Sequence, residues 1–354
     1  MKFTLRKEFL VGLTAVVLGL LAGAVFMAVT GNNPFAGYFY LFAGGLMNVE
    51  RIGNTLAMAT PLILTGLSVA FAFRTGLFNI GAAGQALIGG LVATILALSV
   101  ALPQVLLLPV ILVGAAVGGA LWAWLPGLLK ARFNVHEVVS TIMMNWIAYW
   151  LTYYTIPSYF KGAYETESRI IPEAGSLKLP WLTHLFSGSF INLGLLVALV
   201  AVVVIAVILN RTVLGYRLKA VGFNRFAAEY AGIQVNRHVV ISMTIAGALA
   251  GLAGATLYVG YATSMQIGVL PSIGIDGIAV ALLASNSPLG VLGSALFFGI
   301  LQSGKGFMNA MTKIPPEIGD TIIATIIYFA ATSVLIERWF DRWGQKRRGG
   351  KTSV

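Results

Sequence analysis

The chain of 354 residues lacks cysteine altogether and contains only three histidines. Without cysteine it can form no disulfide, no thiolate-held metal site and no thiol nucleophile. His136, His184 and His238 lie too far apart in the sequence for a metal-ligand motif on one helix. No nucleophile–base pair is apparent either, so we expect neither a metal site nor enzymatic catalysis.

Charged residues are also scarce, at 10% of the chain, whereas 58% of residues are hydrophobic and the mean hydropathy is +0.87. A soluble domain carries about 25% charged residues. The composition therefore predicts an all-α integral membrane protein. The net charge of +11 would suggest a nucleic-acid partner in a soluble protein. In a membrane protein it reports topology instead, so no nucleic-acid partner is expected.

Ten apolar runs are separated by polar or glycine-rich segments. The first contains 22 residues, which is longer than the apolar core of a signal peptide and enough to cross a core of ~30 Å. We therefore expect it to remain as the first helix. About ten transmembrane helices are predicted, of which those at 55–73 and 273–285 are short for full spans. The runs are 9–30, 55–73, 79–100, 104–125, 138–156, 190–209, 239–260, 273–285, 289–303 and 320–337.

A cytoplasmic N-terminus places 17 of the 23 lysines and arginines on the cytoplasmic side. This agrees with the positive-inside rule and predicts that both termini are cytoplasmic. We expect a cytoplasmic N-terminus at 1–8, one transmembrane domain at 9–337 and a basic cytoplasmic tail at 338–354. An external loop at 157–188 and a cytoplasmic loop at 210–238 are both too short to form a domain. The six outer basic residues would be Arg51, Lys161, Arg169, Lys178, Lys305 and Lys313.

The stretch RTGLFNIGAAGQALIGG (74–90) puts five glycines and several polar residues between two apolar runs. Pro61 suits the start of a helix, and 61–73 would then be only about 20 Å long. Either this helix stops inside the membrane and Arg74 is buried, or it begins earlier and Arg74 is a cytoplasmic anchor. We interpret 74–90 as the break and re-entry of a discontinuous helix pair. Asn79 and Gln85 would cap freed backbone groups or contact a substrate.

A similar arrangement occurs in the second half of the chain. At a constant offset of 211, GLSVA (66–70) aligns with GIAVA (277–281), and Arg74 aligns with Ser285. Short or interrupted segments at corresponding positions in two halves are typical of inverted-repeat transporters. The pattern therefore predicts an inverted repeat.

A polar stripe runs along the predicted helix 138–156 and its lead-in, where Glu137, Thr141 and Asn145 recur every four residues. Such groups line a path or form hydrogen bonds between helices. Amides and aromatic rings suit an uncharged polar substrate better than charged groups do. The candidate path residues are Phe78, Asn79, Gln85, Asn145 and Trp146.

The cytoplasmic loop 210–238 contains helix-forming stretches at 217–221 and 225–231, separated by glycines, together with apolar residues that a solvated loop would not need. We expect a short helix here that docks on a partner. GILQSGKG (299–306) has the spacing of a phosphate-binding loop, but Gly306 stands where Ser or Thr is required. We therefore expect no ATP site on this chain.

Four ordered motifs resemble the permease subunits of bacterial ABC importers in the branched-chain amino acid, ribose and nucleoside superfamily. They are the 74–90 stretch, HEVVSTIMMNWIA (136–148), GYRLKAVGFNRFAAEYAGI (215–233) and GIDGIAVALLASNSPLG (274–290). The resemblance covers about 55–337 and is greatest to the longer of two permeases in nucleoside importers. Ala83 departs from the pattern, because glutamate is more usual there.

The resemblance implies a multi-pass protein of the bacterial cell membrane that works by alternating access. Its partners would be a second, shorter permease, an ABC ATPase that binds the ATP, and a substrate-binding lipoprotein. The segment 215–233 would be the coupling helix region that docks on the ATPase. The residues expected to couple are Gly215, Arg217, Gly222, Arg225, Ala227, Ala228, Glu229 and Gly232.

Two other functions remain open from the sequence. A simple-sugar permease of the same fold would share all four motifs. A stand-alone secondary transporter or channel would need buried acidic groups for ion coupling, for which Asp276 and Glu137 are the candidates near the apolar runs.

Overall fold

The computed structural model describes residues 2–332, with side chains from residue 10 onward, and this part of the chain is helical without a β-strand. The basic tail 338–354 lies outside the described residues. The helices are α1 (Lys2–Val29), α2 (Pro34–Leu46), α3 (Val49–Arg74), α4 (Ala82–Ser99), α5 (Gln104–Phe133), α6 (Glu137–Tyr159), α7 (Pro180–Leu185), α8 (Gly194–Arg211), α9 (Val213–Phe223), α10 (Arg225–Tyr230), α11 (Val235–Ala255), α12 (Ile273–Leu283), α13 (Pro288–Thr312) and α14 (Pro316–Ala331). Two further turns are the 3₁₀ turn η1 (Glu173–Gly175) and the π-helical turn η2 (Thr256–Tyr261).

Each of the ten predicted apolar runs contains a helix. Seven helices of the described residues are long and apolar enough to cross a membrane, by length and composition. The run 273–285 is confirmed as short, because α12 has only 11 residues. Helix α2 was not predicted, and it packs along α13. The chain is therefore an all-helical, multi-pass membrane protein.

Helix α3 decides between the two alternatives for the helix around Pro61. It begins after Asn48, whose side chain accepts a hydrogen bond from Arg51 N–H at 2.8 Å, and it continues through Pro61 to Arg74. Its 26 residues correspond to about 39 Å, which is a full span. The alternative that the helix begins earlier is thus the correct one. Only the short turn 75–81 separates α3 from α4, so 74–90 is not a break within a discontinuous span.

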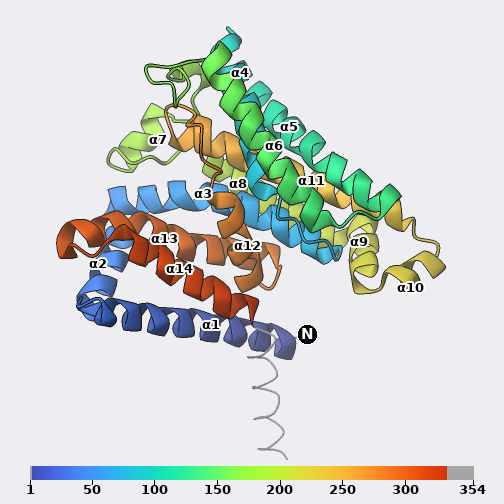
Figure 1. Cartoon of the computed structure of the whole chain (residues 1–354), viewed down its shortest axis with the longest axis horizontal. Helices are drawn as coiled ribbons and strands as arrows, with labels where there is room; N and C mark the ends of the chain where they lie inside the picture. Colours follow the sequence, from blue (N-terminus) through green and yellow to red (C-terminus); the bar gives the residue numbers. More distant parts are fainter. Residues whose placement is uncertain (1, 333–354) are drawn as a thin grey trace, which may run out of the picture.

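Glycines allow the helices to pack closely. A Cβ atom on Gly119 of α5 would collide with Gly247 O of α11, and one on Gly254 would collide with Ala86 O of α4. Small residues at helix contacts are the usual means of close packing in membranes. In Figure 1, α3 passes between α13 and α14 on one side and α4, α5, α6 and α11 on the other. Most of α3 is buried as a result.

Helices α3 and α12 run parallel to each other. Gly66 lies against Val280, and Arg74 at the end of α3 reaches Ser285 just beyond the end of α12. An inverted repeat relates segments that cross the membrane in opposite directions. The alignment of 66–70 with 277–281 therefore does not describe an inverted pair, although the two motifs do pack against each other.

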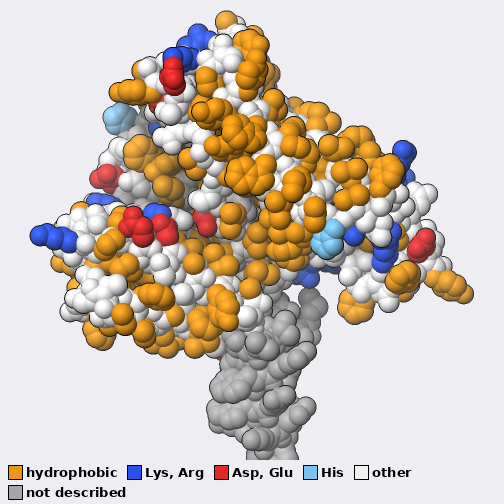
Figure 2. All heavy atoms as spheres, in the orientation of Figure 1, with side chains coloured by type: hydrophobic (Ala, Val, Ile, Leu, Met, Phe, Trp, Pro, Cys, Tyr) orange, Lys and Arg blue, Asp and Glu red, His pale blue; other side chains and the backbone are white. Residues whose placement is uncertain are grey.

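The two ends of the molecule differ in character. Helices α9 and α10 lie at the right of Figure 1, at the same end as the start of α1. Basic side chains lie over this region in Figure 2, while hydrophobic side chains cover much of the rest of that face. At the opposite end, residues 160–193 fold back onto 259–267. In this contact Ile171 N–H donates to Thr263 O at 2.9 Å, and Leu177 N–H donates to Val259 O at 2.9 Å.

Candidate binding pocket and docking surface

The amides of the 74–90 stretch bond to each other. Asn79 Nδ2 donates to Gln85 Oε1 at 2.9 Å, and Gln85 Nε2 donates back to Asn79 Oδ1 at 3.0 Å. Asn79 Oδ1 also accepts from Gly81 N–H, at the start of α4. Both side chains are fully buried. This is the geometry of a helix cap rather than of an open contact site.

Asn145 of α6 completes the same cap from a neighbouring helix. Its Oδ1 accepts from Gly84 N–H at 2.8 Å, and its Nδ2 donates to Ile80 O at 3.1 Å. Gly84 is the third residue of α4, where backbone N–H groups lack partners within the helix. Asn145 therefore fastens α6 to the start of α4, and a Cβ atom on Gly84 would meet it at 2.7 Å.

The two aromatic path candidates lie apart from this network. Phe78 packs against Phe73, with ring centroids 5.1 Å apart. Trp146 is 52% exposed and lies on an outer apolar face of α6 with Met143, Ile147, Trp150 and Tyr154. Thus the structure brings together Asn79, Gln85 and Asn145 but not Phe78 or Trp146.

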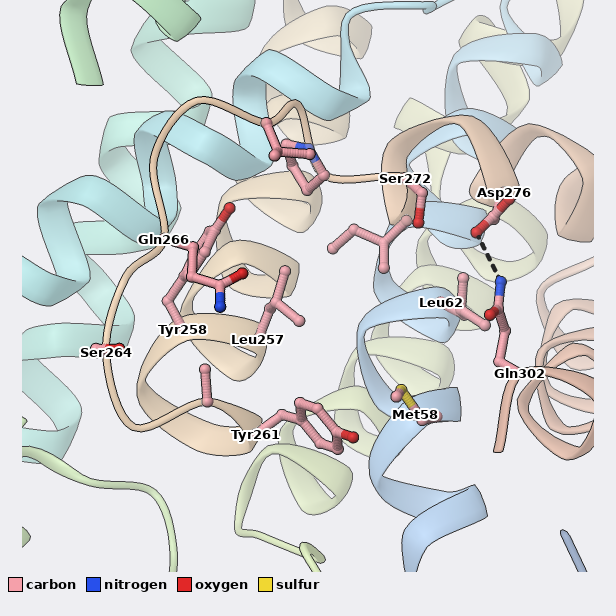
Figure 3. Close-up of a pocket in the computed structure, with 14 residues that line it drawn as sticks. Met58, Leu62, Leu257, Tyr258, Tyr261, Ser264, Gln266, Ser272, Asp276 and Gln302 are labelled. Carbon is pink, nitrogen blue, oxygen red and sulfur yellow. Dashed lines mark hydrogen bonds between the residues drawn. The ribbon is translucent and has the colours of Figure 1, made fainter. Parts of the chain in front are cut away.

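A cavity of about 350 Å³ lies elsewhere, between α3, the π-helical turn η2, the loop 262–272, α12 and α13 (Figure 3). Its size suits a small molecule. Single π-helical turns interrupt α-helices frequently at functional sites. None of the five predicted path residues lines this cavity. Its lining consists of Met58, Leu62, Leu257, Tyr258, Tyr261, Ala262, Ser264, Gln266, Val269, Pro271, Ser272, Ile273, Asp276 and Gln302.

The polar groups of this pocket lie on more than one wall. Gln302 Nε2 of α13 donates to Asp276 Oδ2 of α12 at 3.3 Å, with Ser272 one turn before Asp276. Figure 3 shows Tyr258 and Gln266 across the pocket from this pair, with Tyr261 and Met58 along one edge. The pocket thus has one side with aromatic rings and Gln266, and an opposite side with Asp276, Gln302 and Ser272.

Sequence reasoning missed most of these residues. Gln302 lies in GILQSGKG, which the structure places within α13 and not in a phosphate-binding loop. The sequence indicates Asp276 only as a candidate for ion coupling. A usable signal was present, because Asp276 is the single carboxylate in the short apolar helix 273–283. No comparable sequence feature predicts the π-helical turn η2.

The loop 210–238 forms two consecutive helices, α9 and α10, as its pattern predicted. Thr212 and Asn224 cap them, accepting from Gly215 N–H at 3.1 Å and from Ala227 N–H at 3.0 Å. Gly232 ends α10 with a φ of +80°. Ile233 N–H donates to Ala228 O and Gly232 N–H to Glu229 O, the paired bonds of a glycine-terminated helix.

The outer face of α9 and α10 is apolar and exposed. Phe223, Phe226 and Tyr230 are 96%, 81% and 97% exposed. The predicted coupling residues Arg217, Gly222, Arg225, Ala227, Glu229 and Gly232 are also exposed, whereas Gly215 and Ala228 are buried beneath them. Large aromatic groups exposed beside charged residues are typical of a surface that binds another protein.

Helix α9 is seated directly on the end of α3. A Cβ atom on Gly222 would collide with Arg74 O, and Gly76 has a φ of +75° opposite it. Burial and the charge of Arg74 lower the pKa of Lys219, whose Nζ donates to Asn210 Oδ1 at 2.9 Å. Arg74 in turn donates to Ser285 O and Asn286 O beyond α12. Arg74 therefore lies at the helix end beside α9, and not midway through the helix bundle.

A helical body with several candidate membrane spans, a pocket between its helices and two exposed short helices at one end is consistent with a transport permease. Residues 51–331 match the family described as the permease component of the branched-chain amino acid transport system, and the chain belongs to this family.

Several relatives match it over nearly its whole length. It is 43% identical to the guanosine ABC transporter permease protein NupP of Bacillus subtilis, covering 93% of this chain and 95% of that protein. It is 41% identical to the nucleoside ABC transporter permease protein NupB of Lactococcus lactis (94% and 93%). It is 32% identical to the glucose ABC transporter permease protein TsgB13 of Haloferax volcanii (93% and 90%). A second guanosine permease protein of Bacillus subtilis, NupQ, is 29% identical (70% and 79%).

Proposed function

We propose that this chain is the permease subunit of an ATP-driven importer and forms the path for nucleosides across the bacterial cell membrane. The observation that carries this proposal is the identity of 43% and 41% with guanosine and nucleoside permeases over more than nine-tenths of the chain. The pocket agrees with such a substrate, because a nucleoside has one aromatic part and one hydroxyl-rich part, and the pocket contains both aromatic rings and hydrogen-bond acceptors.

The proposed topology has ten membrane segments and cytoplasmic termini. In this orientation α9 and α10 lie in the cytoplasm, and residues 160–193 lie outside. The basic residues at the ends of α3, α5 and α8 support it, since Arg74, Lys130, Arg132 and Arg211 all fall on the cytoplasmic side.

In the proposed mechanism, α9 and α10 dock on a separate ABC ATPase that binds the ATP. Phe226 and Tyr230 would enter the ATPase surface, while Arg217, Arg225 and Glu229 would form its polar rim. Because α9 contacts the end of α3, movement of the docking surface reaches the helix that borders the pocket. A second permease and a substrate-binding lipoprotein would complete the importer, as the pair NupP and NupQ suggests for the permeases.

The proposal is tested by two substitutions on the docking surface, one that reverses a charge and one that introduces a charge. Glu229→Arg and Phe226→Glu should each abolish co-purification with the ATPase and ATP-driven nucleoside uptake, while the permease still accumulates in the membrane. Glu173→Arg, an equivalent reversal at the opposite end, should leave ATPase co-purification intact. Gly222→Arg is a poorer test, because Gly222 has no room for a side chain. Full uptake by Phe226→Glu would contradict the proposed docking surface.

A simple-sugar permease is the second candidate, favoured by the 32% identity with the glucose permease TsgB13. The two functions are separated by loading the complete importer, with its own binding protein, with radiolabelled guanosine, ribose or glucose in turn. We expect uptake of guanosine, competed by other nucleosides and not by free sugars.

A further inference from the structure

We propose that Asp276, supported by Gln302, accepts hydrogen bonds from the two adjacent ribose hydroxyls of a nucleoside passing through the pocket. This inference rests on the proposed function and names the group that the pocket recognises. The geometry points to it, because Asp276 and Gln302 are held together at 3.3 Å on one wall of a cavity of about 350 Å³.

The hydrogen-bonding capacity of this pair remains partly free. A carboxylate accepts about four hydrogen bonds through two oxygens, and it donates none. Gln302 supplies one donor, to Oδ2, and the Ser272 hydroxyl supplies another, so about two acceptor positions are left. Two neighbouring hydroxyls can therefore donate to the carboxylate side by side, while the Gln302 carbonyl remains available as a further acceptor. Bonds to an ionised acceptor are stronger than bonds between neutral groups.

We expect Asp276 to recognise the ribose and not the base, because the ribose is the part that all ribonucleosides share. Their bases present different donors and acceptors, and adenine offers no pair of adjacent donors comparable to the guanine edge. The ribose diol is the same in every ribonucleoside. An acceptor-only carboxylate that recognised the base would discriminate among nucleosides, whereas one that recognises the diol would serve all of them.

The rest of the pocket suits the other half of the molecule. Tyr258 and Gln266 face Asp276 across the cavity, and Tyr261 and Met58 line its edge (Figure 3). An aromatic base can pack against rings and apolar side chains in a sequence-tolerant way. The arrangement thus places the base on the aromatic side and the ribose on the Asp276 side.

The test compares Asp276→Asn with wild type in the complete importer reconstituted with its ATPase and binding protein. Guanosine, inosine, adenosine and 2′,3′-dideoxyguanosine are supplied at concentrations that saturate the binding protein. The measured quantity is the ratio of variant to wild-type uptake for each compound, because selection by the binding protein cancels in that ratio. Asparagine keeps the shape and can still accept from Gln302, so α12 and α13 stay joined.

We expect Asp276→Asn to reduce uptake of the three ribonucleosides by about tenfold and that of 2′,3′-dideoxyguanosine by less than twofold. Glu317→Gln removes an exposed carboxylate at the start of α14, outside the pocket, and it should stay within twofold for all four. An equal loss for the dideoxy compound would overturn the proposal, since Asp276 would then be structural. A loss confined to guanosine would also overturn it, because the carboxylate would then bind the base.

If Asp276→Asn does not assemble with the ATPase, wild type alone still decides. Bound 2′,3′-dideoxyguanosine should then be transported about tenfold more slowly than bound guanosine, and equal rates would overturn the proposal. Absence of any nucleoside uptake by the assembled wild-type importer is a different result, which contradicts the proposed function itself.

Discussion

Two groups of polar side chains lie inside the apolar body, and they differ in whether their hydrogen-bonding groups all have partners within the protein. Asn79 and Gln85 bond to each other, and Asn79 and Asn145 also bond to the backbone at the start of α4. Asp276 bonds to Gln302 and to the Ser272 hydroxyl, and the pair otherwise faces a cavity. A buried polar group costs free energy unless it is paired, which explains the bonds of the first group, whereas Asp276 and Gln302 are only partly buried. The first group finds its partners within the protein, whereas the second has capacity left for a ligand.

The largest effect is expected at Asn145, which satisfies two backbone groups at once. Asn145→Ala leaves Gly84 N–H and Ile80 O without their side-chain partner, and each unsatisfied group costs about 1–3 kcal/mol. We expect the free energy of unfolding in detergent to fall by about 2 kcal/mol or more. Ile147→Ala, on the exposed face of the same helix, should cost less. A stable Asn145→Ala protein with lost uptake would instead place Asn145 in the path.

A smaller effect is expected for the reciprocal pair Asn79 and Gln85. Each single alanine variant leaves a buried amide unpaired and should cost about 1–2 kcal/mol. The double variant removes both amides and should cost less than the sum of the two, a coupling that thermal unfolding can measure. Uptake per assembled importer should be unchanged in all three variants. A fall in that rate without loss of stability would break the distinction between the two groups.

The sequence pattern predicted much of the fold, but it did not distinguish the amides that cap a helix from the polar residues that line the pocket. Apolar runs located all seven helices of the described residues that are long and apolar enough to cross a membrane, and helix-forming stretches with glycines located α9 and α10. The sequence left open whether a helix begins at Pro61, because proline is also compatible with a helix interior in a membrane when neighbouring groups compensate. Residue type alone could not tell Asn79 from Gln302, since both are amides in apolar surroundings. The difference depends on the loop 262–272 and the π-helical turn, which only tertiary packing determines.

Arg74 joins the end of α3 to the turn after α12, and the effect of its substitution should be smaller again. Its Nε and Nη2 donate to Asn286 O at 3.0 Å and Ser285 O at 3.2 Å, in a turn where both residues have φ near +50°. Arg74→Lys keeps the charge that orients the helix but lacks the planar fork needed for both bonds. We expect a loss of about 1 kcal/mol and faster amide exchange at 284–287. Unchanged exchange there would show that Arg74 acts only as a charged anchor.

The smallest effect, and one of opposite sign, is expected at Thr94 of α4. Its Oγ1 is buried and has no hydrogen-bond partner among the described residues. Thr94→Val removes that hydroxyl at nearly constant shape, so the protein should be unchanged or more stable by up to about 1 kcal/mol. Thr152→Val is the matched control. Thr152 Oγ1 donates to Ala148 O at 2.9 Å, so loss of this hydroxyl should lower the stability of the protein. Destabilisation by Thr94→Val would show that the Thr94 hydroxyl stabilises the protein although it has no hydrogen-bond partner among the described residues. An unused hydrogen-bonding group would then not by itself indicate a ligand site.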